Sequence, residues 1–348
     1  MKGNGLFCWW RAAARLILAC AFFALPVAHV CAARERIHIQ PKFQPGDTLY
    51  YQIEMHSVST GKTTTPIINP EGGTKFSENV DLLVQLDVLP EPSAVTGSAK
   101  PEQAAGGEPV RMRVTYLKAH ADSQSDAPAF DTSLAGSEYD RLAGHSFEFT
   151  LEPGGGIADF KDVDHILPNS SDPAQTLSWM KNLASGNEFP QRGIAIGQKW
   201  ASEKPLASAP LTGLVWQADS TYLRNEPCSS PAATARAKRN SSAASGQCAV
   251  IMTEFQIVRH SSKHSETPPD YLRHGLRTSG AITGSGESLD SISLETGLLT
   301  SSTQSSTQNA DFDITSAANG EAIHRVGQVQ TQTNITQVSA PPAAATQP

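Results

Sequence analysis

Apolar and polar residues alternate with a period of two along much of the chain. In the range 48–58 the apolar positions are Leu49, Tyr51, Ile53 and Met55, and the range 79–89 repeats the pattern from Val80 onwards. This spacing puts successive side chains on opposite faces of a strand, and it is typical of antiparallel sheets with one buried face. We expect further strands at 110–116, 147–151, 157–160, 213–223, 249–258, 276–282, 291–295, 298–314 and 326–338.

One segment has helical rather than strand periodicity. Asp172 precedes Pro173, and Gln175 follows three residues after Asp172, which is the pattern of a capped helix start. Gly186 supplies the stop. The expected fold class is therefore mainly β, a curved antiparallel sheet (half-barrel or open barrel) with one packed α-helix.

The two ends of the chain differ in composition from the rest. Residues 1–32 run from basic to apolar to small residues and predict a secretory signal peptide. We expect one exported β domain over 33–338, interrupted by flexible insertions at 89–109 and 226–247, and a disordered tail at 339–348. The protein should then reside in the periplasm or outside the cell.

Cysteine use agrees with export. Once the signal is removed, only Cys228 and Cys248 remain, and an even pair in an exported protein predicts a disulfide. The 19 residues between them argue against the close spacing of a redox pair. If the strands at 213–223 and 249–258 pair, this bond closes the base of a long hairpin loop.

Composition and charge exclude several classes of protein. The chain of 348 residues is 39% hydrophobic with 26 Gly and 23 Pro, too apolar for a disordered protein and too rich in turn formers for a helical bundle. Its net charge of −7 disfavours a nucleic-acid partner.

Motifs for catalysis and cofactors are missing. No nucleophile elbow, zinc-protease motif or dinucleotide fingerprint occurs, so we expect neither enzyme activity nor a cofactor. His260 and His264 have a possible metal-ligand spacing but sit in a loop-like sequence, and no metal site is assigned. Glu287, Asp290 and Glu295 are interpreted as solvated residues.

Small polar residues fill both sides of the expected strand around 300–308. This composition is typical of a strand with water on both faces. Three explanations are open: the strand lines a wet cavity, it lies at a sheet edge, or it is simply solvated.

Short turn sequences spread through the chain resemble those of secreted bacterial β-proteins that are distantly similar to periplasmic lipoprotein-carrier half-barrels. They are Gly46–Tyr50, Glu152–Ile157, Gly197–Trp200 and Leu294–Leu298. The resemblance implies a curved sheet whose concave face is partly covered by a helix and holds an apolar ligand. It supplies no catalytic residues.

Two hypotheses for function follow. The first is a non-enzymatic exported protein that binds an apolar or amphipathic ligand such as a lipid, or an envelope protein. Its candidate lining residues, which could equally form a packed core, are Leu49, Tyr51, Ile53, Met55, Val80, Leu82, Val84, Trp179, Met180 and Trp216. The alternative is a structural or adhesive envelope module that acts through Ser/Thr/Gln-rich edge strands.

Overall fold

The structure is a computed structural model of the full chain. By its internal contacts the chain divides into Met1–Glu35 and Arg36–Pro348, and every element of secondary structure discussed here belongs to the second unit. The residues that the structure describes are 35–65, 73–90, 109–126, 139–152, 157–161, 189–190, 192–206, 209–228, 246–260 and 267–339.

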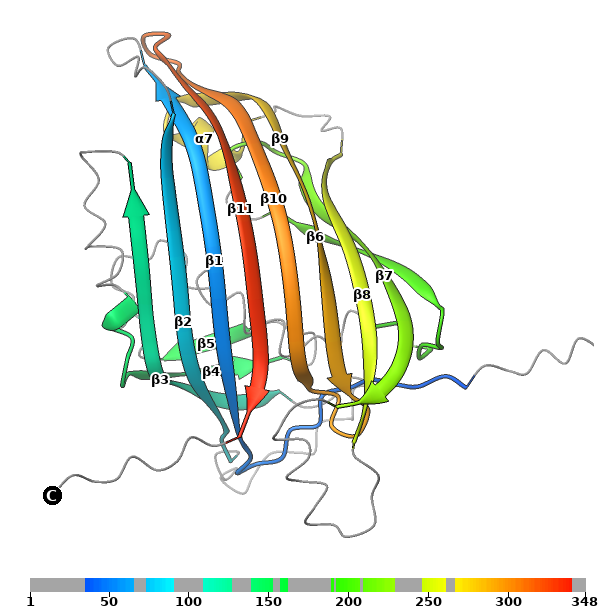
Figure 1. Ribbon diagram of the computed structural model, residues 1–348. Helices are drawn as coiled ribbons and strands as arrows, with labels where there is room; N and C mark the ends of the chain where they lie inside the picture. Colours follow the sequence, from blue (N-terminus) through cyan, green and yellow to red (C-terminus); the bar gives the residue numbers. More distant parts are fainter. Residues whose placement is uncertain are drawn as a thin grey trace, which may run out of the picture. The chain divides into compact units, whose positions relative to one another are not determined.

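A single antiparallel sheet contains all eleven strands of the described residues (Figure 1). The elements are β1 (Thr48–Thr64), β2 (Thr74–Val88), β3 (Val110–Ser125), β4 (Ser146–Leu151), β5 (Ile157–Lys161), β6 (Lys199–Pro205), β7 (Leu214–Pro227), β8 (Gln247–Arg259), α7 (Pro269–Arg273), β9 (Leu276–Ser293), β10 (Leu299–Ser316) and β11 (Ala322–Val338). The predicted fold class, a curved and unclosed antiparallel sheet, is confirmed.

The strand order places the first and last strands side by side. It runs β5-β4-β3-β2-β1-β11-β10-β9-β8-β7-β6. Long pairings hold this arrangement together, and the one between β1 and β11 extends from Tyr50 opposite Val338 to Thr64 opposite His324. The edges of the sheet are therefore β5 and β6, two short strands from the middle of the sequence.

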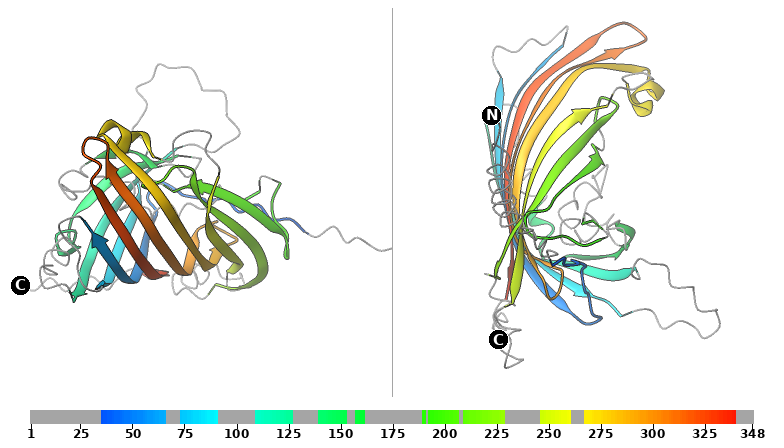
Figure 2. Two further views of the ribbon diagram at one scale, coloured as in Figure 1. Left: turned by 90° about the horizontal axis from the view of Figure 1, so that it is seen from above. Right: turned by 90° about the vertical axis from the view of Figure 1, so that its right-hand side faces the viewer.

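The sheet is curved (Figure 2), and one of its faces carries the hydrophobic core. We call this the inner face, and its opposite the outer face. Leu82, Ile53 and Ile335 lie in one row of the inner face on neighbouring strands, and each is at most 6% exposed. β4 and β5 run crosswise to the long strands (Figure 1), and the buried Phe147 and Phe149 of β4 belong to the same core cluster.

The predicted disulfide between Cys228 and Cys248 is present. β7 and β8 pair as a hairpin, and the last rungs of that pairing bring Glu226 opposite Cys248 and Pro227 opposite Gln247. The bond therefore closes the base of the connection between these strands, as expected. Both cysteines are buried.

β9 is one continuous strand where the sequence pattern predicted two. Apolar periodicity fails in its middle because Gly284 and Gly286 occupy inner-face positions. A Cβ at Gly284 would lie 2.9 Å from Cδ1 of Ile257, and one at Gly286 would collide with the backbone oxygen of Ser305 and with the ring of Phe255. Side chains of β8 and the backbone of β10 thus occupy the space that a side chain would need at these two positions of β9.

Two elements were not predicted. β6 contains Lys199, Glu203 and Lys204, and these charged residues obscure its alternation. The short helix α7 follows Pro268, in a segment interpreted as a loop, and its first residue is a proline, which is well tolerated there. None of the helices in the described part of the chain has the length and apolar character needed to cross a membrane.

The Ser/Thr/Gln-rich strands are not edge strands, so that part of the structural-module hypothesis is wrong. β10 and β11 lie in the middle of the sheet, hydrogen-bonded on both sides. These strands are polar because they are solvated on both faces, and not because they form a free edge. Residues 303–316 of β10 and 322–334 of β11 extend beyond the hydrophobic core.

Several predicted features lie outside the described residues. They are the signal peptide at 1–32, the helix at 172–186 with Trp179 and Met180, His264, most of both insertions, and the tail beyond residue 339.

Candidate functional site

A small polar hollow lies on the inner face where the hydrophobic core ends. The inner-face row that contains Leu82, Ile53 and Ile335 continues on the next strands as Ser302 and Asp290. The neighbouring row crosses β6 to β10 and consists of Trp200, Ser220, Thr253, Ser288 and Gln304. Strand register alone therefore gathers one carboxyl group, four hydroxyl groups and an amide next to the core.

The hollow has a volume of about 80 Å³, enough for a few water molecules or a small organic group. Its lining, called the inner hollow below, is Phe189, Trp200, Ser220, Ile251, Thr253, Ser288, Asp290, Ile292, Leu299, Ser302 and Gln304. The floor is polar and the walls are apolar, which is the composition usual for sites that bind and orient small ligands.

The Asp290 carboxyl group is the centre of the polar floor. The hydroxyl of Ser302 donates to its Oδ1 at 2.6 Å, and the hydroxyl of Ser288 donates to its Oδ2 at 3.0 Å. Burial raises the pKa of Asp290 above its ordinary value, and the two hydroxyl donors oppose that rise only in part. The carboxyl group is thus held in one orientation at a place that disfavours its charged form.

Aromatic and aliphatic side chains form the walls. The rings of Phe189 and Trp200 pack with their centroids 5.8 Å apart, tilted by 59°. Ile251, Ile292 and Leu299 are at most 3% exposed and continue directly into the core. A ligand in the inner hollow would contact both polar groups and a dry apolar surface.

The interpretation of Asp290 as a solvated residue is wrong. Ser288, Asp290 and Ile292 alternate on the inner face of β9, whereas Leu289 points outward and is 44% exposed. Apolar character is thus a poor guide to the buried face at this point in β9. The signal that could have located Asp290 is its spacing of two from Ile292, because Ile292 is buried.

The predicted lining residues occupy other places. Leu49, Tyr51, Ile53, Val80, Leu82 and Val84 are all buried in the main core, and Met55 packs against it. Trp216 belongs to a second, smaller cluster with Leu211, Leu214 and Ile257. None of them lines the inner hollow, although the core they form borders it. Their role toward a ligand stays a prediction.

Tyr51 connects this core to the hollow. The side chain is fully buried, and its hydroxyl donates to the carbonyl oxygen of Leu299, a wall residue, at 3.1 Å. Burial raises the pKa of Tyr51 well above its ordinary value, so the hydroxyl remains protonated and a donor. The start of β10 is thereby fixed against β1.

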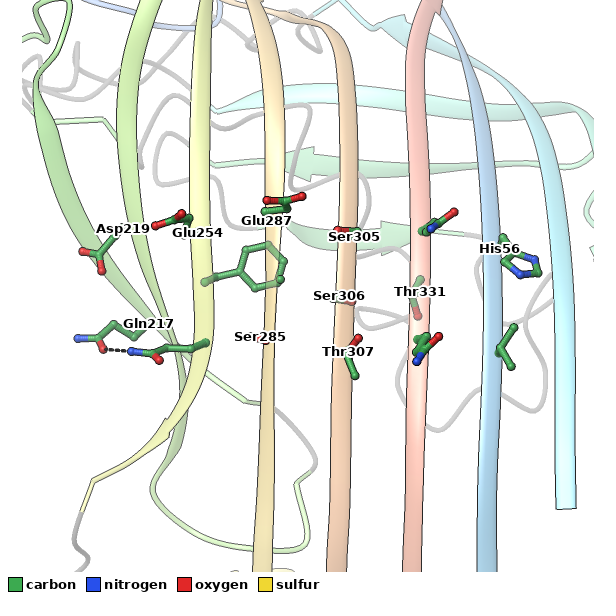
Figure 3. A pocket seen from close by; sticks show the side chains of 16 residues that line it. His56, Gln217, Asp219, Glu254, Ser285, Glu287, Ser305, Ser306, Thr307 and Thr331 are labelled. Atoms are coloured by element: carbon green, nitrogen blue, oxygen red, sulfur yellow. Dashed lines mark hydrogen bonds between the residues drawn. The ribbon is translucent and has the colours of Figure 1, made fainter. Parts of the chain in front are cut away.

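A larger groove, of about 810 Å³, crosses the outer face (Figure 3). It runs between two rows of side chains on β1, β11, β10, β9, β8 and β7. The rows are His56, Gln332, Ser305, Glu287, Glu254 and Asp219, and Val58, Gln330, Thr307, Ser285, Gln256 and Gln217. The two glutamines at one end are joined by a 3.2 Å hydrogen bond from Gln256 to Gln217.

The outer groove is a solvated surface rather than a built site. Its carboxylates, Asp219, Glu254 and Glu287, are exposed and lie side by side on three strands (Figure 3). In the described ranges no three His, Cys, Asp or Glu side chains are placed to hold a metal ion. His260, one of the two histidines with a possible metal-ligand spacing, contacts Glu203 at 3.1 Å.

Comparisons with known proteins establish no relationship. No family model matches the chain, and no curated protein matches it. Among solved structures, the outer membrane protein OprG from Pseudomonas aeruginosa is 6% identical, with 87% of this chain and all of that chain covered at a TM-score of 0.17. A chain solved under the heading "Asymmetric conductivity of engineered proteins" is 10% identical, with 82% and 100% covered at a TM-score of 0.20. TM-scores this low establish neither a shared fold nor a shared function.

Proposed function

We propose that the protein is an exported, non-enzymatic binding protein of the bacterial envelope that holds a small amphipathic ligand in the inner hollow. The observation that carries this proposal is the composition of the hollow, in which a hydrogen-bonded carboxyl group and hydroxyl groups face Phe189, Trp200 and Leu299. A ligand with a polar end and an apolar body is complementary to that surface.

Two further features support export. The Cys228–Cys248 disulfide is of the kind that forms and persists in oxidising compartments. The order of basic, apolar and small residues over 1–32 is that of a secretory signal. Binding rather than catalysis is the simplest use of the inner hollow, because its described lining contains one carboxyl group and no histidine, cysteine or lysine beside it.

The ligand can be sought by mass spectrometry of the protein as the cell makes it. The full chain is expressed with its own N-terminal segment, purified without detergent, and measured under native and denaturing conditions. We expect an additional mass that is present in the native spectrum and lost on denaturation.

Two leucine variants on β10 test whether that mass occupies the inner hollow. Ser302→Leu places an apolar side chain into the hollow, whereas Thr303→Leu places it on the exposed outer face of the same strand. The first variant should lose the bound mass and the second should retain it, and thermal unfolding shows that both are folded. A wild-type protein without bound mass, or equal retention by the two variants, would overturn the proposal.

A further inference from the structure

Among the described residues that line the inner hollow, the Asp290 carboxyl group has no positive partner. Its two hydrogen-bond donors, Ser288 and Ser302, are neutral. The other described residues that line the hollow from β6, β7, β8 and β10 are neutral as well, so Asp290 is the one titratable group among them. Glu287, three residues before it, points to the outer face.

An unpaired carboxylate in such surroundings is destabilising unless something neutralises it. Removal of an ion from water is unfavourable inside a protein, and either a proton or a bound cation relieves this cost. Burial raises the pKa of Asp290, so these surroundings favour its protonated form. A ligand that brings its own positive charge could replace the proton.

The rest of the lining is suited to an ammonium group. Ser220, Thr253 and Gln304 add oxygen atoms that can accept hydrogen bonds from N–H groups, alongside the carboxyl group. Trp200 and Phe189 add aromatic rings, whose faces attract cations. An anionic end group would bind less favourably, because the described lining contains no basic side chain to pair with it and already holds a carboxyl group.

We infer that the inner hollow selects ligands that end in an organic ammonium group, with the Asp290 carboxylate as the counterion and Trp200 and Phe189 beside it. This inference rests on the proposed function, because it names the chemical class of ligand for the same site. It also assigns the Ser288 and Ser302 hydroxyl groups the role of positioning residues, which orient the carboxylate.

The inference predicts a particular dependence on pH. Binding of a cation requires ionised Asp290, so affinity for an ammonium ligand rises as the pH rises through the raised pKa of this group. A neutral ligand of the same shape needs no ionisation. Its affinity should not increase over that range, because Asp290 is the one group of the described lining that titrates.

Three probes of equal length separate the possibilities. Isothermal titration calorimetry of the full chain with n-butylammonium, n-butanol and butyrate varies only the end group. We expect butylammonium to bind at least tenfold more tightly than butanol, and butyrate to bind least. Asp290→Asn should remove the preference for butylammonium. The matched control, Glu287→Gln, removes a carboxylate from the outer face of the same strand and should leave the preference intact.

The outcomes distinguish the inference from the proposed function. If butanol binds as tightly as butylammonium, or if butyrate binds best, selection of a cation is wrong and a ligand-binding hollow remains. If none of the three probes binds, both are wrong. If butylammonium is preferred equally by wild type and Asp290→Asn, the cation is bound elsewhere and the inference is overturned.

Discussion

The disulfide at the base of the β7–β8 hairpin offers a quantitative test of what stabilises the sheet. Cys228 and Cys248 are 20 positions apart in the sequence. Closing a loop of about 20 residues removes about 11 cal/mol/K of entropy from the unfolded chain, which is about 3.3 kcal/mol at 25 °C. The double substitution Cys228→Ala and Cys248→Ala should therefore lower the free energy of unfolding by about 3 kcal/mol or slightly more, since it also removes two buried sulfur atoms.

Urea unfolding, followed by tryptophan fluorescence, measures this loss. Oxidised wild type, reduced wild type and the double variant are compared, and reduction isolates the cross-link from the loss of sulfur packing. The m-value should rise in both forms without the bond, because the unfolded chain then exposes more surface. The reasoning would be refuted if the three free energies of unfolding lay within about 1 kcal/mol of one another. The bond would then add little to a pairing of β7 and β8 that is already complete.

Three other substitutions test the inner face. Because the pKa of Asp290 is raised in the folded state, the stability of wild type should fall as the pH rises from the ordinary carboxyl value through the raised one. Asp290→Asn should remove this fall, which is measured as melting temperature against pH. Tyr51→Phe should cost about 1 kcal/mol in urea unfolding, because it removes the hydrogen bond to the Leu299 carbonyl. Gly286→Ala should cost about 1–3 kcal/mol in the same assay, because its Cβ would collide with the backbone oxygen of Ser305 and with the ring of Phe255.

Each of these variants has a neighbour on the outer face as its control. Glu287→Gln should leave the slope of stability against pH unchanged, and parallel profiles for wild type and Asp290→Asn would contradict the assignment of that slope. Tyr50→Phe and Ser285→Ala alter the adjacent outward-facing positions and should change the free energy of unfolding by less than about 0.5 kcal/mol. If Tyr51→Phe or Gly286→Ala is as mild as its control, the corresponding contact contributes nothing measurable.

Alternation predicts this fold well wherever one face of a strand is apolar. Burial imposes apolar residues at every second position around Ile53 and Val84, so these regions are predicted as strands. The two cysteines predict the disulfide that closes the base of the β7–β8 hairpin. The middle of β9 was missed because the inner-face space of Gly284 and Gly286 is filled by side chains from β8. When atoms of neighbouring strands fill the space beside a glycine, the local sequence gives no sign that the glycine faces inward.

The candidate site was harder to predict than the sheet. The short turn between β9 and β10 brings Ser302 opposite Asp290, whereas Trp200 reaches them only through the successive pairings of β6, β7, β8 and β9. Each residue alone resembles an ordinary surface or core position. A wet cavity is one explanation for the polar composition of residues 300–308. The central location of β10 excludes a sheet edge, and Ser302 and Gln304 line the inner hollow.

The pairing of β1 with β11 has a consequence for how the protein reaches its native state. This seam joins the first and last strands of the described sheet. One of the two neighbours of β1 is therefore close to it in sequence, whereas the other lies almost the full length of the sheet-forming sequence away. Contacts so distant in sequence slow folding, because the entropy of loop closure is lost before the contact stabilises anything. The backbone hydrogen bonds between β1 and β11 also join two halves of the sheet, β1–β5 and β6–β11, which the chain links covalently between β5 and β6. Two polypeptides divided between β5 and β6 should therefore recognise each other and reassemble.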